Sequence, residues 1–256
     1  MKPATLLLSS LLGLASILVF PQRSVVASAE SVAQGAAILL VADERAARFP
    51  DQTYTANMEI YKHGELRSTL VFSMAMKNLE KQLIRFVEPG DVAGMKILME
   101  NRDTIYMYSP EFQKVRRIAA HMQNQGFLGS EFTPEDMILA RLSPSFDADL
   151  IGKTGAETAL VLTPKSGVTV SFSKLEIFID STVGGISRIH YYDVGGKHVR
   201  TQLREVWKRF EDAQMPTQIR MKNLVTGDET IIRLSNIDVK SPVAEDLFSR
   251  RTLMSG

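Results

Sequence analysis

The first long segment of the chain carries apolar residues at the spacing of an amphipathic helix. The pattern predicts a helix over residues 31–49, which ends before the Pro50-Asp51 pair. The apolar positions recur every three or four residues and comprise Ile38, Leu39, Ala42, Ala46 and Phe49. The charged positions are expected largely on the other face and comprise Asp43, Glu44, Arg45 and Arg48.

After Pro50 the apolar period changes from helical to two, which predicts strands with one apolar face. Residues 54–60 and 66–76 alternate in this way around a polar turn at 62–65, which indicates a hairpin. Further strands are expected at residues 83–87, 95–100, 104–108, 148–152, 159–163, 174–180, 186–193, 199–207, 217–223 and 229–239. Glycine-containing turns separate most of them, so consecutive strands are expected to pair antiparallel.

Two short helices interrupt or follow the strands. Thr133 can cap the first, Pro134 fits its first position, and Glu135 and Asp136 favour the positive end of the helix dipole. The second is expected at residues 243–248. An open sheet of about eleven strands tends to curl. The predicted fold is therefore mainly β: a curled, incomplete antiparallel barrel with helices covering the concave face.

The N-terminal segment has the features of a secretory signal peptide. Lys2 precedes an apolar run over residues 6–20, and Ala27-Ser28-Ala29 supplies the small residues of a cleavage site. The run of about 15 residues is shorter than the roughly 20 that span a bilayer. We expect residues 1–29 to be removed, residues 30–256 to form a single domain, and the protein to be exported to the periplasm.

Composition narrows the function classes. The chain has no cysteine, which excludes disulfides, a thiol nucleophile and a lipidated cysteine anchor. Removal of the signal would change the net charge from +1 to −1, which gives no support for a nucleic-acid partner. The four histidines are scattered, and no nucleophile elbow or phosphate-binding glycine loop is present. We therefore expect no enzymatic activity, no cofactor and no metal site.

The apolar strand faces of the first half are unusually rich in methionine, which adapts to ligands of irregular shape. A deformable lipid-binding cavity and an ordinary packed core both fit this pattern. The candidate cavity residues are Met58, Ile60, Leu70, Phe72, Met74, Met76, Ile84, Phe86, Ile97, Met99, Ile105 and Met107.

Residues 125–132 form an apolar loop with glycines, which fits either a lid over a cavity or a buried connection. The candidate lid residues, including the start of the following helix, are Phe127, Leu128, Gly129, Phe132, Met137 and Ile138. A basic run precedes the loop, and it fits either an exposed polar edge or a contact with anionic headgroups or an acidic partner. Its candidate contact residues are Lys114, Arg116 and Arg117.

In order, these pieces resemble the LolA-like family of outer membrane lipoprotein-sorting proteins. The matching segments are Glu88-Pro89-Gly90-Asp91-Val92, the strand 105–108, Lys114-Val115-Arg116-Arg117-Ile118, and Phe127-Leu128-Gly129-Ser130-Glu131-Phe132-Thr133. The resemblance implies a curled antiparallel sheet with helices in its hollow, and a soluble periplasmic carrier. Such a carrier shields the acyl chains of a lipoprotein or lipid and hands them on towards the outer membrane.

The resemblance also implies partners. These are an acylated lipoprotein or another lipid, an inner-membrane transporter and an outer-membrane acceptor, for a protein that we expect to be a monomer without a membrane anchor. A second class remains open, because envelope sensors of the same fold bind lipid or acylated ligands as signals.

Overall fold

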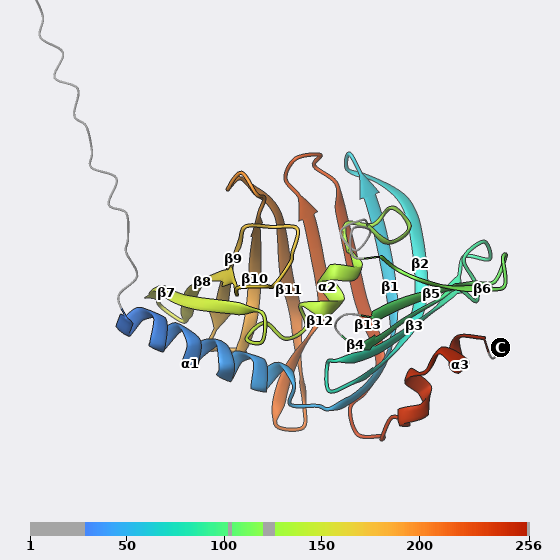
Figure 1. Ribbon diagram of the computed structural model, residues 1–256, viewed down its shortest axis with the longest axis horizontal. Helices are drawn as coiled ribbons and strands as arrows, with labels where there is room; N and C mark the ends of the chain where they lie inside the picture. Colours follow the sequence, from blue (N-terminus) through green and yellow to red (C-terminus); the bar gives the residue numbers. More distant parts are fainter. Residues whose placement is uncertain (1–28, 102–103, 120–125, 255–256) are drawn as a thin grey trace, which may run out of the picture.

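The computed structural model describes residues 29–101, 104–119 and 126–254, whose strands form a single antiparallel sheet (Figure 1). Its 13 strands are ordered β6-β5-β4-β3-β2-β1-β13-β12-β11-β10-β9-β8-β7. The strands are β1 Asp51–Lys62, β2 Glu65–Lys77, β3 Lys81–Glu88, β4 Lys96–Asn101, β5 Thr104–Ser109, β6 Lys114–Arg117, β7 Phe146–Thr154, β8 Glu157–Pro164, β9 Lys174–Asp180, β10 Gly185–Tyr192, β11 His198–Phe210, β12 Ala213–Asn223 and β13 Glu229–Asp238. The helices are α1 Ala29–Ala46, η2 Phe127–Gly129, α2 Pro134–Ile138, η3 Glu245–Phe248 and α3 Arg250–Met254.

The predicted fold class is confirmed, because the sheet is an incomplete antiparallel barrel whose edge strands β6 and β7 do not pair within the described part of the chain. The expected number of about eleven strands was too low. The basic run Lys114–Arg117 is itself a strand, paired with β5. Its sequence has three basic residues in four positions, so it lacks the apolar alternation by which the other strands were predicted.

Helix α1 lies along the open side of the barrel and packs against β7 and β10. A Cβ atom on Gly35 would lie 2.3 Å from the carbonyl oxygen of Ala148, so only glycine permits this close approach. The expectation that Asp43 lies on the solvent face was wrong: Asp43 is 1% exposed. It follows Leu39 by four positions, and residues at this spacing share one face of a helix. The expected signal peptide lies outside the described residues, apart from Ala29.

Two apolar clusters fill the concave side of the sheet. The first joins α1 to strands β7–β10 and β12 and includes Leu39, Phe146 and Ile189. The second lies on strands β1–β5 and includes Phe72 and Ile97. Helix α2 lies over the concave side between the two halves, where Met137 belongs to the second cluster and Leu139, just after the helix, belongs to the first.

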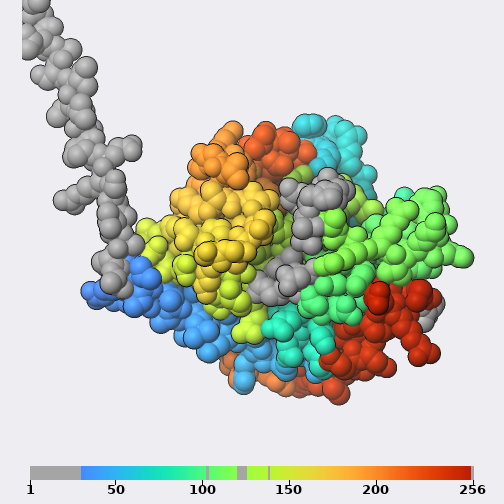
Figure 2. Space-filling view, viewed as in Figure 1, coloured from blue at the N-terminus to red at the C-terminus, as the bar shows by residue number. Residues whose placement is uncertain are grey.

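The C-terminal segment packs on the opposite, convex face of strands β3–β6. Figure 2 shows this segment, coloured red, at the surface beside the teal and green part of the chain. Phe248 and Leu253 pack there with Leu83 and Leu98 in a third apolar cluster. The single helix expected at residues 243–248 is instead the short helix η3 followed by α3. Among the helices of the described residues, none is both long enough and apolar enough to cross a membrane.

A cluster of aromatic side chains on the convex face, which includes His190 and His198, makes the stability of the fold pH-dependent. Burial lowers the pKa of His190 from 6.5 to about 4; His198, whose ring is 4.3 Å away, and Arg188 add to this, and Glu176 opposes it. Between these pH values the unfolded chain binds a proton at His190 that the folded protein does not bind, so stability falls as pH drops. We expect the free energy of unfolding, measured in urea, to fall by about 2 kcal/mol from pH 7 to pH 4. This fall should be smaller in His190→Phe.

The matched control for this pH dependence is His63→Asn, because His63 is exposed in a turn with φ of 53°, which asparagine tolerates. The control should keep the wild-type slope of stability against pH. An unchanged slope in His190→Phe would show that another group causes the dependence.

Candidate functional site

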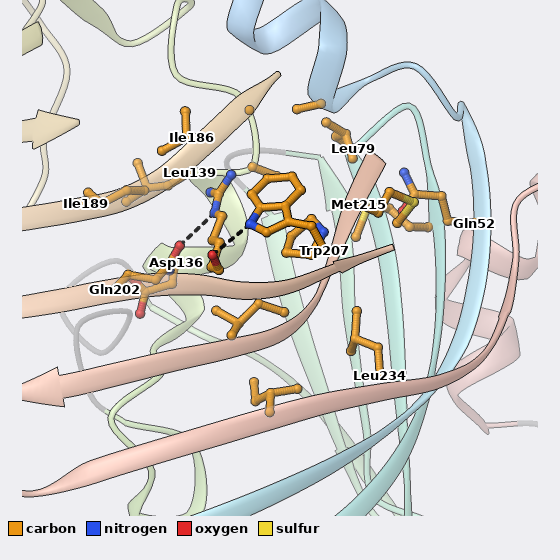
Figure 3. Close-up of a pocket in the computed structure, with 18 of the residues that line it drawn as sticks. Gln52, Leu79, Asp136, Leu139, Ile186, Ile189, Gln202, Trp207, Met215 and Leu234 are labelled. Carbon is orange, nitrogen blue, oxygen red and sulfur yellow. Dashed lines mark hydrogen bonds between the residues drawn. The ribbon is translucent and has the colours of Figure 1, made fainter. Parts of the chain in front are cut away.

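A cavity of about 660 Å³ lies on the concave side of the sheet. Residues of both concave clusters line it, and Ile232 on the central strand β13 packs against both. The labelled side chains in Figure 3 converge on this space from β1, the β2–β3 turn, β10–β13 and the α2 region. Its volume falls within the roughly 300–1,000 Å³ typical of small-molecule sites.

All twelve residues predicted for a cavity lie in or against one apolar cluster on the concave face. Those that line the cavity are Met58, Phe72, Met74, Met76 and Ile84. The others pack in the same cluster away from the cavity lining and are Ile60, Leu70, Phe86, Ile97, Met99, Ile105 and Met107. The period-two pattern therefore selected residues that share the concave face of β1–β5, without separating the cavity wall from the solid core beside it.

The predicted lid loop lies over the cavity, and Phe127, Phe132 and Met137 line it. A Cβ atom on Gly126 would lie 1.9 Å from the carbonyl oxygen of Ser130, so the loop's tight path requires glycine there. The other candidates differ in position. Leu128 is 41% exposed, Gly129 adopts a φ of 82°, and the side chain of Ile138 lies outside the described residues.

Hydrogen bonds of Glu131 connect the loop at residues 126–132 to the rim of the sheet. Its carboxylate accepts hydrogen bonds from the Lys62 amine at 2.8 Å and from the Asn223 amide at 2.9 Å. Its backbone N–H donates to the Thr230 hydroxyl at 2.9 Å. These contacts attach the loop to β1, β12 and β13 at one side of the cavity. The role of the loop as a lid stays a prediction.

The basic candidates lie elsewhere. Lys114, Arg116 and Arg117 are exposed on the edge strand β6, and the Arg116 guanidinium lies 5.9 Å from the Phe112 ring. They are not among the residues that line the cavity. Their expected contact with headgroups or a partner stays a prediction.

The wall formed by β10–β12 was not predicted, and its centre is Trp207 (Figure 3). Val206 has a φ of 51°, a strained conformation for a β-branched residue, and the alternation of side chains changes phase there. Gln202 and Arg204 before it and Trp207 after it therefore all line the cavity. A Cβ atom on Gly185 would lie 2.7 Å from the Trp207 ring, so glycine makes room for the indole.

One group of polar side chains lies where α2 meets β10 and β11, beside the cavity. Arg200 forms an ion pair with Asp136 at 2.6 Å, and its guanidinium lies 4.4 Å from the Tyr191 ring. Burial raises the pKa of Tyr191 well above its usual range, so this phenol stays neutral. The Arg204 Nε donates to the Gln202 side-chain oxygen at 3.1 Å. The single tryptophan beside a run of basic residues was the only sequence signal for this wall.

The open end of the cavity is bordered by the end of α1 and two hairpin turns. Arg48 forms an ion pair with Asp212 in the β11–β12 turn. Arg45 donates a hydrogen bond of 3.4 Å to the carbonyl oxygen of Gly184 in the β9–β10 turn. Both arginines are exposed, so these contacts can break and re-form without disturbing the core.

Comparisons with known proteins agree with this architecture. A family model described as "Uncharacterized protein" matches residues 78–255. A DUF1329 family protein from Desulfovibrio piger is 23% identical with a TM-score of 0.81, covering 87% of this chain and 99% of that one. A Vibrio parahaemolyticus domain named for outer membrane lipoprotein sorting is 21% identical with a TM-score of 0.78, covering 88% and 100%. A LolA superfamily protein from Nitrosomonas europaea is 18% identical with a TM-score of 0.70, covering 84% and 97%.

At these identities the solved structures establish the fold alone. No curated protein matches the sequence. The family model covers more than half of the chain. The chain therefore belongs to the family that this model describes, and its fold is that of the LolA superfamily.

Proposed function

We propose that the protein is a non-enzymatic carrier that buries acyl chains in the cavity and releases them to an acceptor. The observation that carries this proposal is the cavity itself, which has a volume of about 660 Å³ and is lined by apolar side chains of both concave clusters and by Phe127 and Phe132 of the neighbouring loop. A pocket of this kind suits a ligand that is mainly hydrocarbon.

Burial of an acyl chain has a large free-energy benefit. Each methylene group in water is unfavourable by about 0.8 kcal/mol, so a palmitoyl chain is unfavourable by roughly 12 kcal/mol. Free diffusion through an aqueous compartment is negligible at this cost. A protein that removes even part of the chain from water can therefore move it between two membranes.

The composition of the wall suits release as well as binding. Met58, Met74, Met76, Met137 and Met215 all line the cavity. Methionine side chains are flexible and polarizable, so they adapt to chains of different shape without the tight fit of a rigid core. An adaptable wall leaves room for an acceptor that binds the same cargo more tightly.

The proposed setting is the periplasm, after removal of residues 1–29 as a signal peptide. The cargo would be an acylated lipoprotein or a lipid, taken from an inner-membrane transporter and delivered to an outer-membrane acceptor. The exposed basic strand β6 is the proposed contact with headgroups or with one of these partners.

Native mass spectrometry of the protein purified from the periplasm tests the proposal. We expect co-purifying lipid or acylated protein that is lost on mild activation. A consistently empty protein that also takes up no fluorescent acyl probe would exclude the carrier function.

The ion pair at the open end should control how fast a bound chain leaves. Exposed ion pairs contribute little, so we expect Arg48→Asp to release a fluorescent acyl probe about two- to fivefold faster in stopped-flow experiments. The double variant Arg48→Asp/Asp212→Arg restores the pair with reversed charges and should restore the rate. Equal rates for all three proteins, at low salt, would show that the chain leaves by another route.

A further inference from the structure

The cavity wall contains a part-buried cation, Arg204, without a carboxylate partner among the described residues. Arg45 and Arg209 also line the cavity without an ion pair to a described carboxylate, but both are exposed to solvent. Arg204 lies on β11 and contributes to the lining. Its Nε donates to Gln202, and no carboxylate of the described residues forms an ion pair with it. Arg200, four residues earlier on the same strand, has such a partner in Asp136. Arg200 and Arg204 therefore differ in what balances their charge.

The nearby carboxylates are already engaged. Asp136 also accepts hydrogen bonds from the Thr133 backbone N–H and hydroxyl at 2.8 and 2.9 Å. Asp43 accepts the backbone N–H groups of Leu142 and Ser143, at distances down to 2.7 Å. Neither carboxylate can turn to Arg204 without leaving buried N–H groups unsatisfied.

The surroundings of Arg204 make this charge unfavourable in the empty protein. Ile219, directly opposite on β12, and Trp207 line the cavity beside it. Burial lowers the pKa of the Arg204 guanidinium, and Tyr191 and Asp43 offset this only in part. A partly desolvated charge without a counter-charge is costly, and a bound anion would remove much of that cost.

We propose that the cavity selects anionic amphiphiles, with the hydrocarbon against the methionine-rich wall of β1–β3 and the acid group on Arg204 and Gln202. The inference rests on the proposed carrier function and specifies its ligand class. A guanidinium presents parallel N–H donors that match a carboxylate or a phosphate. The acid group is therefore that of a fatty acid or that of a phospholipid.

Displacement of the neutral fluorescent probe phenylnaphthylamine separates these cases. The competitors are palmitate, palmitoyl lysophosphatidic acid and monopalmitoylglycerol, which share one acyl chain and differ in the head. We expect at least one of the two acids to bind about tenfold more tightly than the neutral monoacylglycerol. The acid that binds more tightly identifies carboxylate or phosphate as the preferred group.

The preference for acids should depend on Arg204. We expect Arg204→Gln to abolish it, Arg204→Lys to retain part of it, and Arg233→Gln, an exposed arginine on the convex face, to leave it unchanged. If monopalmitoylglycerol binds as tightly as the acids in the wild type, the carrier proposal stands and the anion preference is wrong. If the protein binds neither the probe nor any competitor, both are wrong.

Thermal unfolding gives a second readout that distinguishes a ligand-binding arginine from a structural one. Empty Arg204→Gln should unfold at the same temperature as the wild type or a higher one, because an unpaired charge has been removed. Palmitate or lysophosphatidic acid should then raise the unfolding temperature of the wild type more than that of the variant. A clear fall in the unfolding temperature of the empty variant would assign Arg204 a structural role and overturn the proposal.

Discussion

Asp43→Ala should destabilise the folded protein by about 3–6 kcal/mol, more than any surface substitution on the same helix. The Asp43 carboxylate is 1% exposed and accepts the N–H groups of Leu142 and Ser143. Alanine would leave both groups without acceptors in a place that water reaches poorly. Each hydrogen bond to a charged acceptor contributes about 1.5–3 kcal/mol, so the loss of two gives the expected range.

The measurement is the free energy of unfolding in urea, at neutral pH. Glu44→Ala is the matched control, because Glu44 is the next residue of α1 and is exposed; its effect should stay within about 0.5 kcal/mol. Asp43→Asn keeps one acceptor oxygen without the charge and should lie between the two. A loss below 1 kcal/mol in Asp43→Ala would mean that the two N–H groups find other acceptors.

The same carboxylate shows what the sequence pattern could and could not predict. The helical period of α1 was predicted correctly, and Leu39 and Ala42 of its expected apolar face are buried. The expected end at residue 49 was wrong, because the helix ends at Ala46, which is exposed. Asp43 lies on that apolar face at the i+4 position from Leu39. The pattern assigned this charged residue to solvent, because its hydrogen-bond partners are not visible in the local sequence. Only the tertiary structure brings the backbone of residues 142–143 to Asp43.

The alternation of apolar and polar residues in the strands predicted which face each side chain lies on, but not how deeply it is buried. Alternation on β1–β5 predicted the concave face, since side chains in a strand alternate strictly between two faces. It did not predict how deep each side chain lies: Phe72 reaches the cavity, whereas Ile97 packs away from the cavity lining. On β11 the alternation itself fails at Val206, whose left-handed backbone brings Trp207 into the cavity.

Ile232→Trp should abolish most acyl-chain binding and is the sharpest test of the cavity. Ile232 is part-buried on the central strand β13, lines the cavity and packs against both concave clusters. A tryptophan there fills space that a ligand would occupy. Exclusion of only three methylene groups removes about 2.4 kcal/mol of binding free energy, so affinity for a fluorescent acyl probe should fall at least roughly 50-fold.

The control for Ile232→Trp is Ser235→Trp, which adds the same ring on the same strand at an exposed position on the other face of the sheet. Probe affinity of this control should equal that of the wild type. Ile232→Trp should keep the wild-type unfolding temperature within a few degrees, because the ring enters existing space and displaces little of the packed core. A folded Ile232→Trp that still binds the probe with wild-type affinity would place the acyl chain outside this cavity, and the proposed function would then need another site.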